Sequence, residues 1–324
     1  MSVGSLNELS SRAIIGRYYA TLENLGVAPW VDGISMPFSS NQDSETYKML
    51  LQSPVFRKWA DGRQHKGLDV QGVTILNDHF EATLDIPVAD LRRDKTGQIM
   101  VRVDDLARRT STHWNKLLSE LIYYGNASVA TYGAASSADG QDFFDDDHST
   151  GDSGTLQNDI DATDVPALNL TLGAPTAAEM AAALLGVIAY MHSYTDNQGE
   201  PLNEDATQFI AMVGLPLFYG PLVQACTLNN LSNSSGLNNP LSGQFNVTPI
   251  YNQRLASATT QLFVFRTDAP VKSFIRQSET EPTMKTQTAG SAIEFEDDAW
   301  SYGVDAWRGV GYGLWQYACR ATMS

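Results

Sequence analysis

The chain has 324 residues, of which 43% are hydrophobic and 18% charged, and its formal net charge is −16. This length can bury a full core, and a charged fraction below the roughly 25% of an average soluble domain favours a subunit covered by its neighbours. A protein that reads DNA grooves needs Lys and Arg to displace counterions, so 37 acidic against 21 basic side chains argue against that class. A container for DNA remains open, because a container need not bind its contents.

The sequence also argues against secretion and membrane insertion. The first fifteen residues, MSVGSLNELSSRAII, lack the basic region and apolar core of a signal peptide. No run of about 18 apolar residues is present, so we expect no membrane span. Cys226 and Cys319 show no metal-ligand spacing and are too few for a disulfide framework. We therefore expect a protein that is made and stays in a cytoplasm-like compartment.

The first part of the chain predicts an arm followed by a strand pair. In residues 1–60, short apolar helical stretches are interrupted by Gly and Pro, which indicates an extended arm with short helical pieces. Polar and apolar residues then alternate without a fault from His79 to Ile86, which predicts a strand. An upstream alternating run changes phase at Gly72, and Asn77-Asp78 suits a tight turn between the two runs. An isolated hairpin is marginally stable, so we expect this one to lie on a neighbouring subunit.

The next part changes to a helical period. Apolar residues recur every three or four positions from Ile99 to Tyr124, which predicts one strut-like helix about 39 Å long. Thr176 and Glu179 form a capping-box pattern that opens a helix ending near Tyr194. Another helix is predicted from Pro216 to Leu228. Short strands are expected at 209–213, 261–266, 271–275, 292–295 and 313–318, and the mixture indicates an α+β fold.

Candidate catalytic chemistry is sparse. The best candidate metal site is an acidic cluster of Asp145, Asp146, Asp147, His148 and Asp152. Carboxylates suit hard cations, but the spacing of a calcium loop is missing, so a solvated acidic loop is favoured over a structural cation or a metal-dependent hydrolase. The series Gly309, Gly311, Gly313 lacks the spacing and context of a nucleotide loop and indicates close backbone packing. We therefore expect no cofactor, no bound metal and no catalytic residue.

Four sequence stretches, in this order along the chain, carry a distinctive pattern. The first joins Glu45-Thr46-Tyr47 to Trp59-x-x-x-Arg63, and the second runs from Asp139 to His148 as Asp-Gly-x-x-Phe-Phe-x-x-x-His. The third is Arg266-Thr267-Asp268-Ala269-Pro270-Val271-Lys272-Ser273-Phe274-Ile275, and the fourth, most specific one runs from Tyr302 to Gln316. Together they resemble the major head subunit family of Mu-like phages. The resemblance covers roughly residues 45–324 and leaves the polar loops 149–164 and 229–243 unaligned.

The resemblance implies the Hong Kong 97 type of tailed-phage capsid fold. On this basis, residues 1–60 are expected to form an N-terminal arm, 61–88 an extended hairpin loop, and 89–170 a peripheral domain with a spine helix at about 99–124. Residues 171–290 are expected to form an axial domain, and 291–324 C-terminal strands that return to the core. The implied function is that of a structural major capsid protein that forms hexamers and pentamers in an icosahedral shell around phage double-stranded DNA.

The resemblance also implies partners. The short segment before the matching region leaves no room for a fused scaffolding domain, so a separate scaffold and a maturation protease are expected, together with a portal. A decoration protein on the outer surface is left open. The shell is expected to assemble in the host cytoplasm and to end in the virion, with DNA enclosed without sequence-specific binding. The alternative is an encapsulin-type compartment that encloses protein, which the contents of purified shells would distinguish.

Intersubunit contacts are predicted mainly along the hairpin and its flanks, where charged pairs can set the register of neighbouring subunits. The candidate interface residues are Arg63, Lys66, Val70, Val73, Ile75, Asn77, Asp78, Phe80, Leu84, Ile86, Arg92, Arg93, Arg109 and Trp114.

Overall fold

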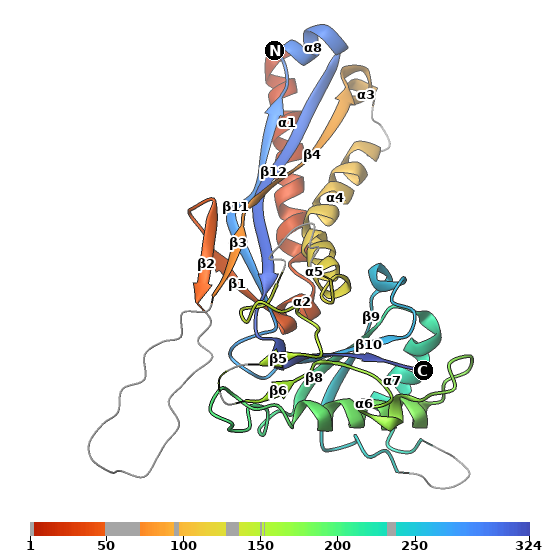
Figure 1. Cartoon of the computed structure of the whole chain (residues 1–324). Helices are drawn as coiled ribbons and strands as arrows, with labels where there is room; N and C mark the ends of the chain where they lie inside the picture. Colours follow the sequence, from red (N-terminus) through yellow and green to blue (C-terminus); the bar gives the residue numbers. More distant parts are fainter. Residues whose placement is uncertain are drawn as a thin grey trace, which may run out of the picture.

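A computed structural model describes residues 3–48, 72–93, 97–127, 136–149, 151, 153–231 and 238–324, with side chains described from Ser11 onward. The chain forms two main sheets, one with four strands and one with five, and two small two-stranded sheets. Figure 1 shows the long four-stranded sheet and its helices standing on the part that holds the five-stranded sheet. Among the described residues, no helix combines the length and apolar character needed to cross a bilayer.

The five-stranded sheet is covered on both faces. Its strands, in spatial order, are β7 (Asp159–Ile160), β13 (Ala318–Thr322), β10 (Gln261–Arg266), β8 (Gln208–Val213) and β9 (Asn246–Tyr251). Helices α6 (Ala177–Met191) and α7 (Pro216–Thr227) share one hydrophobic cluster with one face. Helices α2 (Pro29–Ile34) and α5 (His113–Tyr123) share a second cluster with the opposite face. Burial from both sides explains why β8 and β10 are apolar without alternation.

The predicted capping box is present at the start of α6. The Thr176 hydroxyl accepts a hydrogen bond from the Glu179 amide at 3.2 Å, and the Glu179 carboxylate accepts one from the Thr176 amide at 2.8 Å. The helix ends at Met191, three residues before the predicted end. The hydrogen bonds from Thr176 and Thr171 lower the pKa of Glu179 from 4.5 to about 2.

We expect Glu179 to stabilise the fold in a pH-dependent way. Because its pKa is lower in the folded chain, its contribution is fully present above about pH 4.5 and is lost as the pH falls to about 2. Glu179→Gln should therefore lower the free energy of unfolding by roughly 1 kcal/mol at pH 6 and by less at pH 3. Denaturant unfolding of the unassembled subunit at both pH values measures this, with exposed Glu204→Gln as the control. An equal loss at both values would contradict the prediction.

The long sheet has the spatial order β1 (Ser35–Ser39), β11 (Phe274–Gln287), β12 (Ala299–Tyr312) and β4 (Asp78–Pro87). β1 runs parallel to β11, and the other pairs are antiparallel. At about 3.3 Å per residue, the 14 residues of β12 span roughly 45 Å. The prediction of a strand over residues 313–318 is wrong. β12 ends at Tyr312, a 3-10 turn covers Trp315–Tyr317, and β13 begins at Ala318.

A short helix closes the far end of the long sheet. α8 (Ala292–Asp297) joins β11 to β12 at the tip seen at the top of Figure 1. A strand over 292–295 is therefore wrong. The Ser291 hydroxyl accepts a hydrogen bond from the Glu294 amide at 3.3 Å, and this N-cap pattern outweighs the apolar pair Ile293 and Phe295.

The prediction of short helical pieces in an extended arm is wrong for residues 3–25, which form one helix, α1 (Val3–Leu25). Gly16 does not interrupt this helix, because a glycine inside a helix costs only about 1 kcal/mol. The burial of Ile14 and Tyr18 against β12 and the helix α4 (Gln98–Ser111) offsets that cost. The helix ends before Gly26, whose φ of 56° lies in the left-handed region. The Arg17 guanidinium on α1 donates two hydrogen bonds to the Asp104 carboxylate on α4, at 2.7 and 2.6 Å, and these bonds fix α1 along α4.

The predicted spine helix is present but divided. α4 (Gln98–Ser111) and α5 (His113–Tyr123) are separated at Thr112, which has φ −75° and ψ 0°. Thr110 and Thr112 donate hydroxyl hydrogen bonds to backbone carbonyls of Leu106 and Arg109. Such competition with the helical ladder bends helices, which explains why a continuous apolar stripe gives two helices. A further short helix, α3 (Val88–Arg93), precedes α4.

The predicted pairing of the hairpin is wrong. β3 (Gly72–Leu76) pairs with β2 (Ser44–Lys48), while β4 pairs with β12, so Asn77-Asp78 does not form a hairpin turn. The strand β4 itself is confirmed over 78–87. Within the expected arm of residues 1–60, residues 44–48 form the strand β2 and not a helical piece. The last small sheet pairs β5 (His148–Ser149) with β6 (Thr155–Leu156), and 3-10 turns cover Pro166–Leu168 and Gln253–Leu255.

Close packing at Gly309 explains part of the glycine series. A Cβ atom at this position would lie 2.3 Å from the Leu76 carbonyl oxygen. Gly309→Ala should therefore lower the free energy of unfolding by roughly 1–3 kcal/mol through overpacking. Gly16→Ala, with nothing within 4 Å of its Cβ, is the control and should be neutral or slightly stabilising. Denaturant unfolding checks the pair, and equal effects would contradict close packing at Gly309.

Candidate assembly interface

The base of the β2–β3 hairpin is fastened to the long sheet. The buried side chain of Gln277 on β11 donates to the Ile75 carbonyl at 3.2 Å and to the Asn77 amide oxygen at 2.8 Å. The Tyr47 hydroxyl donates to the Gln277 amide oxygen at 2.9 Å. Figure 1 shows β2 and β3 beside the long sheet. The two strands thus form a fixed base for the segment that joins residues 48 and 72.

The predicted interface residues of the hairpin fall into three groups. Arg63, Lys66 and Val70 lie outside the described residues. Val73, Ile75 and Asn77 are buried in the hairpin base, and Ile86 is buried with Trp300 in the cluster beneath α1. These four side chains pack within their own subunit, and their contacts with a neighbour stay a prediction. The half-buried side chains are Asp78, Phe80 and Leu84 on β4.

The remaining candidates lie on the helices. Arg92 and Arg93 are exposed at the end of α3. Arg109 is exposed on α4 and pairs with Asp105 at 2.8 Å. Trp114 is buried, and two guanidinium groups lie over its ring, Arg308 at 4.6 Å and Arg276 at 5.8 Å from the ring centroid. Trp114 therefore holds β11 and β12 against α5 and offers no surface to a neighbour.

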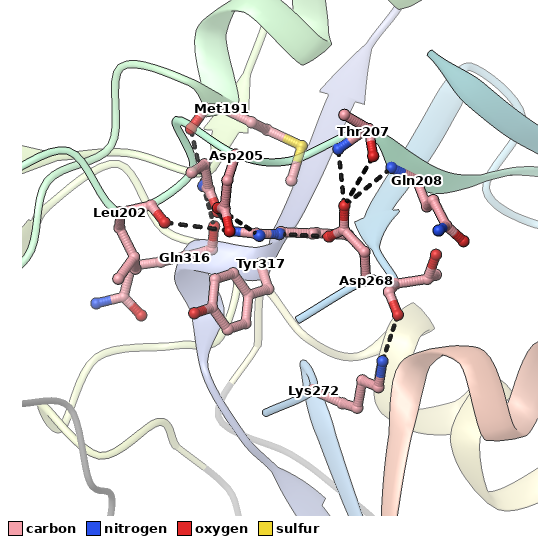
Figure 2. A network of polar contacts seen from close by, with 12 residues as sticks. Met191, Leu202, Asp205, Thr207, Gln208, Asp268, Lys272, Gln316 and Tyr317 are labelled. Atoms are coloured by element: carbon pink, nitrogen blue, oxygen red, sulfur yellow. Dashed lines mark hydrogen bonds and ion pairs between the residues drawn. The ribbon is translucent and has the colours of Figure 1, made fainter. Parts of the chain in front are cut away.

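A buried arginine fixes the loops at one end of the five-stranded sheet. Arg266, at the end of β10, has 4% of its side chain exposed and pairs at 2.6 Å with both Asp268 and Asp205. It also donates to the Leu202 carbonyl and the Asn203 side chain at 3.1 Å. Figure 2 labels both carboxylates and the Tyr317 ring, whose centroid lies 5.3 Å from the Arg266 guanidinium carbon. The network fixes the loop that connects β10 to β11.

The second carboxylate oxygen of Asp268 organises the same junction. It accepts hydrogen bonds from the amides of Thr207 at 2.7 Å and Gln208 at 3.2 Å (Figure 2). Burial alone would raise the pKa of Asp268, but the hydrogen bonds from Arg266 and from these amides lower it below its ordinary value. The carboxylate is therefore held in its charged form at the start of β8. This explains why the stretch from Arg266 to Ile275 carries charged residues between two apolar strands.

The acidic cluster is divided by the fold. His148 is fully buried, stacks on Trp315 with ring centroids 4.0 Å apart, and its Nδ1 atom lies 2.7 Å from the Asp139 carboxylate. Burial works against the charge of Asp139, but the hydrogen bonds from His148 and Ser137 lower its pKa. Asp145 accepts from the Asp147 amide at 2.9 Å, as in a local turn. Asp152 lies outside the described residues, and in the described part no group of three or more potential ligands could hold a metal.

The stacking of His148 on Trp315 links two of the sequence stretches singled out above. His148 ends the stretch that begins at Asp139, and Trp315 lies in the C-terminal stretch. Between them, Phe143 stacks on Tyr312 with ring centroids 4.7 Å apart. These residues are therefore explained by packing at the junction of the two sheets, and the described geometry gives the hydrolase hypothesis no support.

Sequence reasoning missed the buried arginines. Arg266, Arg276 and Arg308 are all less than 10% exposed and lie at the ends or in the middle of apolar strands. Lone cations inside apolar strands are the signal that could have indicated them, because arginine is rarely buried unless it is paired.

The comparisons with known proteins agree with this architecture. The family model described as Mu-like prophage major head subunit gpT matches residues 12–171 and 237–324, which is more than half of the chain. The chain belongs to this family. Its members are head subunits, which are structural proteins and not enzymes. The major capsid protein of Escherichia phage Mu is 27% identical over 115 residues. That match covers 36% of this chain and about a third (35%) of the Mu protein.

Solved structures place the Mu-like head subunit in the tailed-phage capsid fold. The procapsid of bacteriophage JBD30 matches with a TM-score of 0.56 at 18% identity, covering 100% of this chain and 77% of that chain. The capsid of the cyanophage P-SCSP1u matches with a TM-score of 0.52 at 15% identity, covering 92% of this chain and 89% of that one. The predicted α+β fold of the Hong Kong 97 type is confirmed.

Proposed function

We propose that this head subunit is a major capsid protein that assembles as hexamers and pentamers into an icosahedral shell around phage double-stranded DNA. The observation that carries the proposal is the family match over more than half of the chain, joined to a capsid fold over its full length. The long sheet with its terminal helix and the fixed hairpin base give the subunit projecting parts that can contact several neighbours. Heterologous contacts of this kind close into rings.

The charge balance supports enclosure of DNA without tight binding. A net charge of −16 repels a polyanion, so the wall of the shell would not retain the packaged DNA. We propose that the shell assembles in the host cytoplasm and becomes part of the virion. We further propose that a separate scaffold, a maturation protease and a portal take part in assembly. The binding of a decoration protein to the outer surface is left open.

A change of shape during maturation is part of the proposal. The JBD30 protein that this chain resembles occurs in a structure described as a procapsid and in one described as a capsid. A subunit with two packing arrangements would reorient its hairpin and helices between such states. The domain divisions at 1–60, 61–88, 89–170, 171–290 and 291–324 stay predictions. The arrangement is consistent with a division near residues 266–273, where the chain passes from the five-stranded to the long sheet.

Negative-stain electron microscopy of the chain expressed with and without its scaffold tests the proposal. We expect closed shells, or free rings of five and six subunits. Nucleic acid extracted from shells made in infected cells would support the phage function, whereas a single enriched protein cargo would favour the encapsulin-type alternative. A monodisperse monomer at high concentration with scaffold present would contradict the proposal.

A further inference from the structure

The tip of the long sheet carries an exposed aromatic residue within an acidic surrounding. Phe295 on α8 is 92% exposed, by far the most exposed large hydrophobic residue in the described part of the chain. The three residues that follow it, Glu296, Asp297 and Asp298, are exposed as well. Glu294 instead folds back, accepting hydrogen bonds from Gly290 and Trp300. Burial of this ring against another surface would remove its apolar area from water and would be favourable.

A pocket of complementary character lies farther down the same sheet. It has a volume of about 310 Å³ and lies between β4, β12 and the break between α4 and α5. Phe80, Leu106, Val304 and Ala306 contribute apolar surface. The basic lining residues are Arg109, Lys116 and Arg308, against one acidic lining residue, Glu81. Arg109 pairs with Asp105 and Lys116 with Glu120, which leaves Arg308 as the lining cation without an ion pair to a described carboxylate. The pocket therefore suits an apolar group that carries negative charge beside it.

Arg308 provides an independent sign that this pocket has an anionic partner. The residue is 3% exposed, and its Nε atom has no hydrogen-bond partner. Its contacts are the face of Trp114 and a 3.4 Å hydrogen bond to the Thr110 carbonyl. The Glu281 carboxylate favours its charge from a distance, but no described carboxylate forms an ion pair with it. A buried cation without a carboxylate is costly, and pairing lowers that cost. The positive field is also felt by His113, whose pKa falls to about 4 through burial and through Arg308, Lys116 and Arg254.

We propose that α8 of one subunit inserts Phe295 into this pocket of a neighbouring copy and places the acidic residues 296–298 against its basic rim. This inference rests on the proposed function, because it names one of the contacts that hold the shell together. A subunit cannot fill its own pocket. Asp298 and Ala306 are separated by eight residues of a straight strand, or roughly 26 Å. Two different surfaces of one chain then meet, as in a heterologous contact that can close into a ring.

A neighbouring hollow on the same helix is larger, about 760 Å³. Its charged lining consists of four arginines and two aspartates, Arg17, Arg102, Arg108, Arg109, Asp104 and Asp105. Both carboxylates pair with arginines of the hollow, so most of its charge is satisfied within the subunit. The net charge of the two sites is similar, and the buried, unpartnered Nε atom of Arg308 is what favours the smaller pocket.

Photo-crosslinking tests the contact while keeping an aromatic ring at the tip. Phe295 is replaced by p-benzoylphenylalanine, shells are assembled and irradiated, and crosslinked peptides are identified by mass spectrometry. We expect intersubunit crosslinks to peptides that contain Phe80, His113 or Ala306. The same replacement at Phe38, which is 42% exposed on β1, is the control. Intact shells whose position 295 crosslinks elsewhere, or not at all, would overturn the inference.

A substitution series gives a second readout. Phe295→Ser should reduce the yield of closed shells at least tenfold without changing the thermal unfolding of the isolated subunit, while Phe295→Tyr should retain most of the yield. Leu217→Ser, at a 47% exposed position on α7, should leave the yield unchanged. Unchanged shell yield with Phe295→Ser would overturn the contact alone. Failure of the unsubstituted chain to form shells with its scaffold would overturn the proposed function, and the contact with it.

Discussion

Replacing Phe143 with alanine is expected to lower the free energy of unfolding of the isolated subunit by roughly 3–5 kcal/mol. Phe143 is fully buried. Its ring centroid lies 4.7 Å from that of Tyr312, 4.9 Å from Phe144 and 5.0 Å from Phe274. The ring therefore joins the loop of residues 136–149 to strands β11 and β12 of the long sheet. A cavity at this point removes contacts on several sides, and the tightly packed surroundings have little room to collapse.

Denaturant unfolding of the unassembled subunit measures this loss, and Phe295→Ala is the matched control. The control removes the same side chain from a site that is 92% exposed, so its effect should stay within about 0.5 kcal/mol. A loss below about 1 kcal/mol for Phe143→Ala would mean that the packing at this junction is not as the structure places it.

Arg266→Met is expected to destabilise the subunit by about 3 kcal/mol. The substitution keeps much of the apolar stem but leaves Asp268, whose side chain is 15% exposed, without its cation. Removing one member of a buried pair typically costs 3–5 kcal/mol, and a value at the lower end is expected because Asp205 is 77% exposed and can turn to water. The amides of Thr207 and Gln208 would still bind the Asp268 carboxylate.

The double variant Arg266→Met/Asp268→Asn separates loss of the ion pair from loss of packing. If the uncompensated carboxylate causes most of the damage, the double variant should be more stable than Arg266→Met alone. Arg12→Met, at an exposed position on α1, is the control and should be nearly neutral. Thermal unfolding of the four proteins provides the comparison. Equal stability of Arg266→Met and the unsubstituted subunit would show that the network does not stabilise the loops beside the five-stranded sheet.

Much of the fold could be predicted where local pattern and local chemistry agree. β10 has the predicted bounds, β8 and α7 deviate by one residue, and the capping box places the start of α6. β4 follows its alternation although it is an edge strand. In these segments the periodicity reports the burial that the fold provides.

The errors have a common cause in tertiary contacts. The strand at 72–76 could pair with its sequence neighbour, but β4 instead joins β12, more than 200 residues later, and β3 joins β2. Long apolar pairing along β12 decides this, and no local signal reports it. Local sequence likewise does not report the partners of Arg266 and His148. Arg266 pairs with Asp205, 61 residues away, and His148 stacks on Trp315, which lies near the C-terminus. Tertiary contacts also decide which residues of the predicted interface are exposed in the single subunit, as Arg109 is, and which are buried, as Trp114 is. The interface residues stay predictions.

The central claim is that copies of this one chain close into an icosahedral shell, and cryo-electron microscopy of assembled particles tests it most directly. We expect a reconstruction in which this fold fits both the five-fold and the six-fold rings, with the α8 tip of each subunit against the Arg308 pocket of a neighbour. Particles built from another protein, or a chain that stays monomeric beside its scaffold, would contradict the claim.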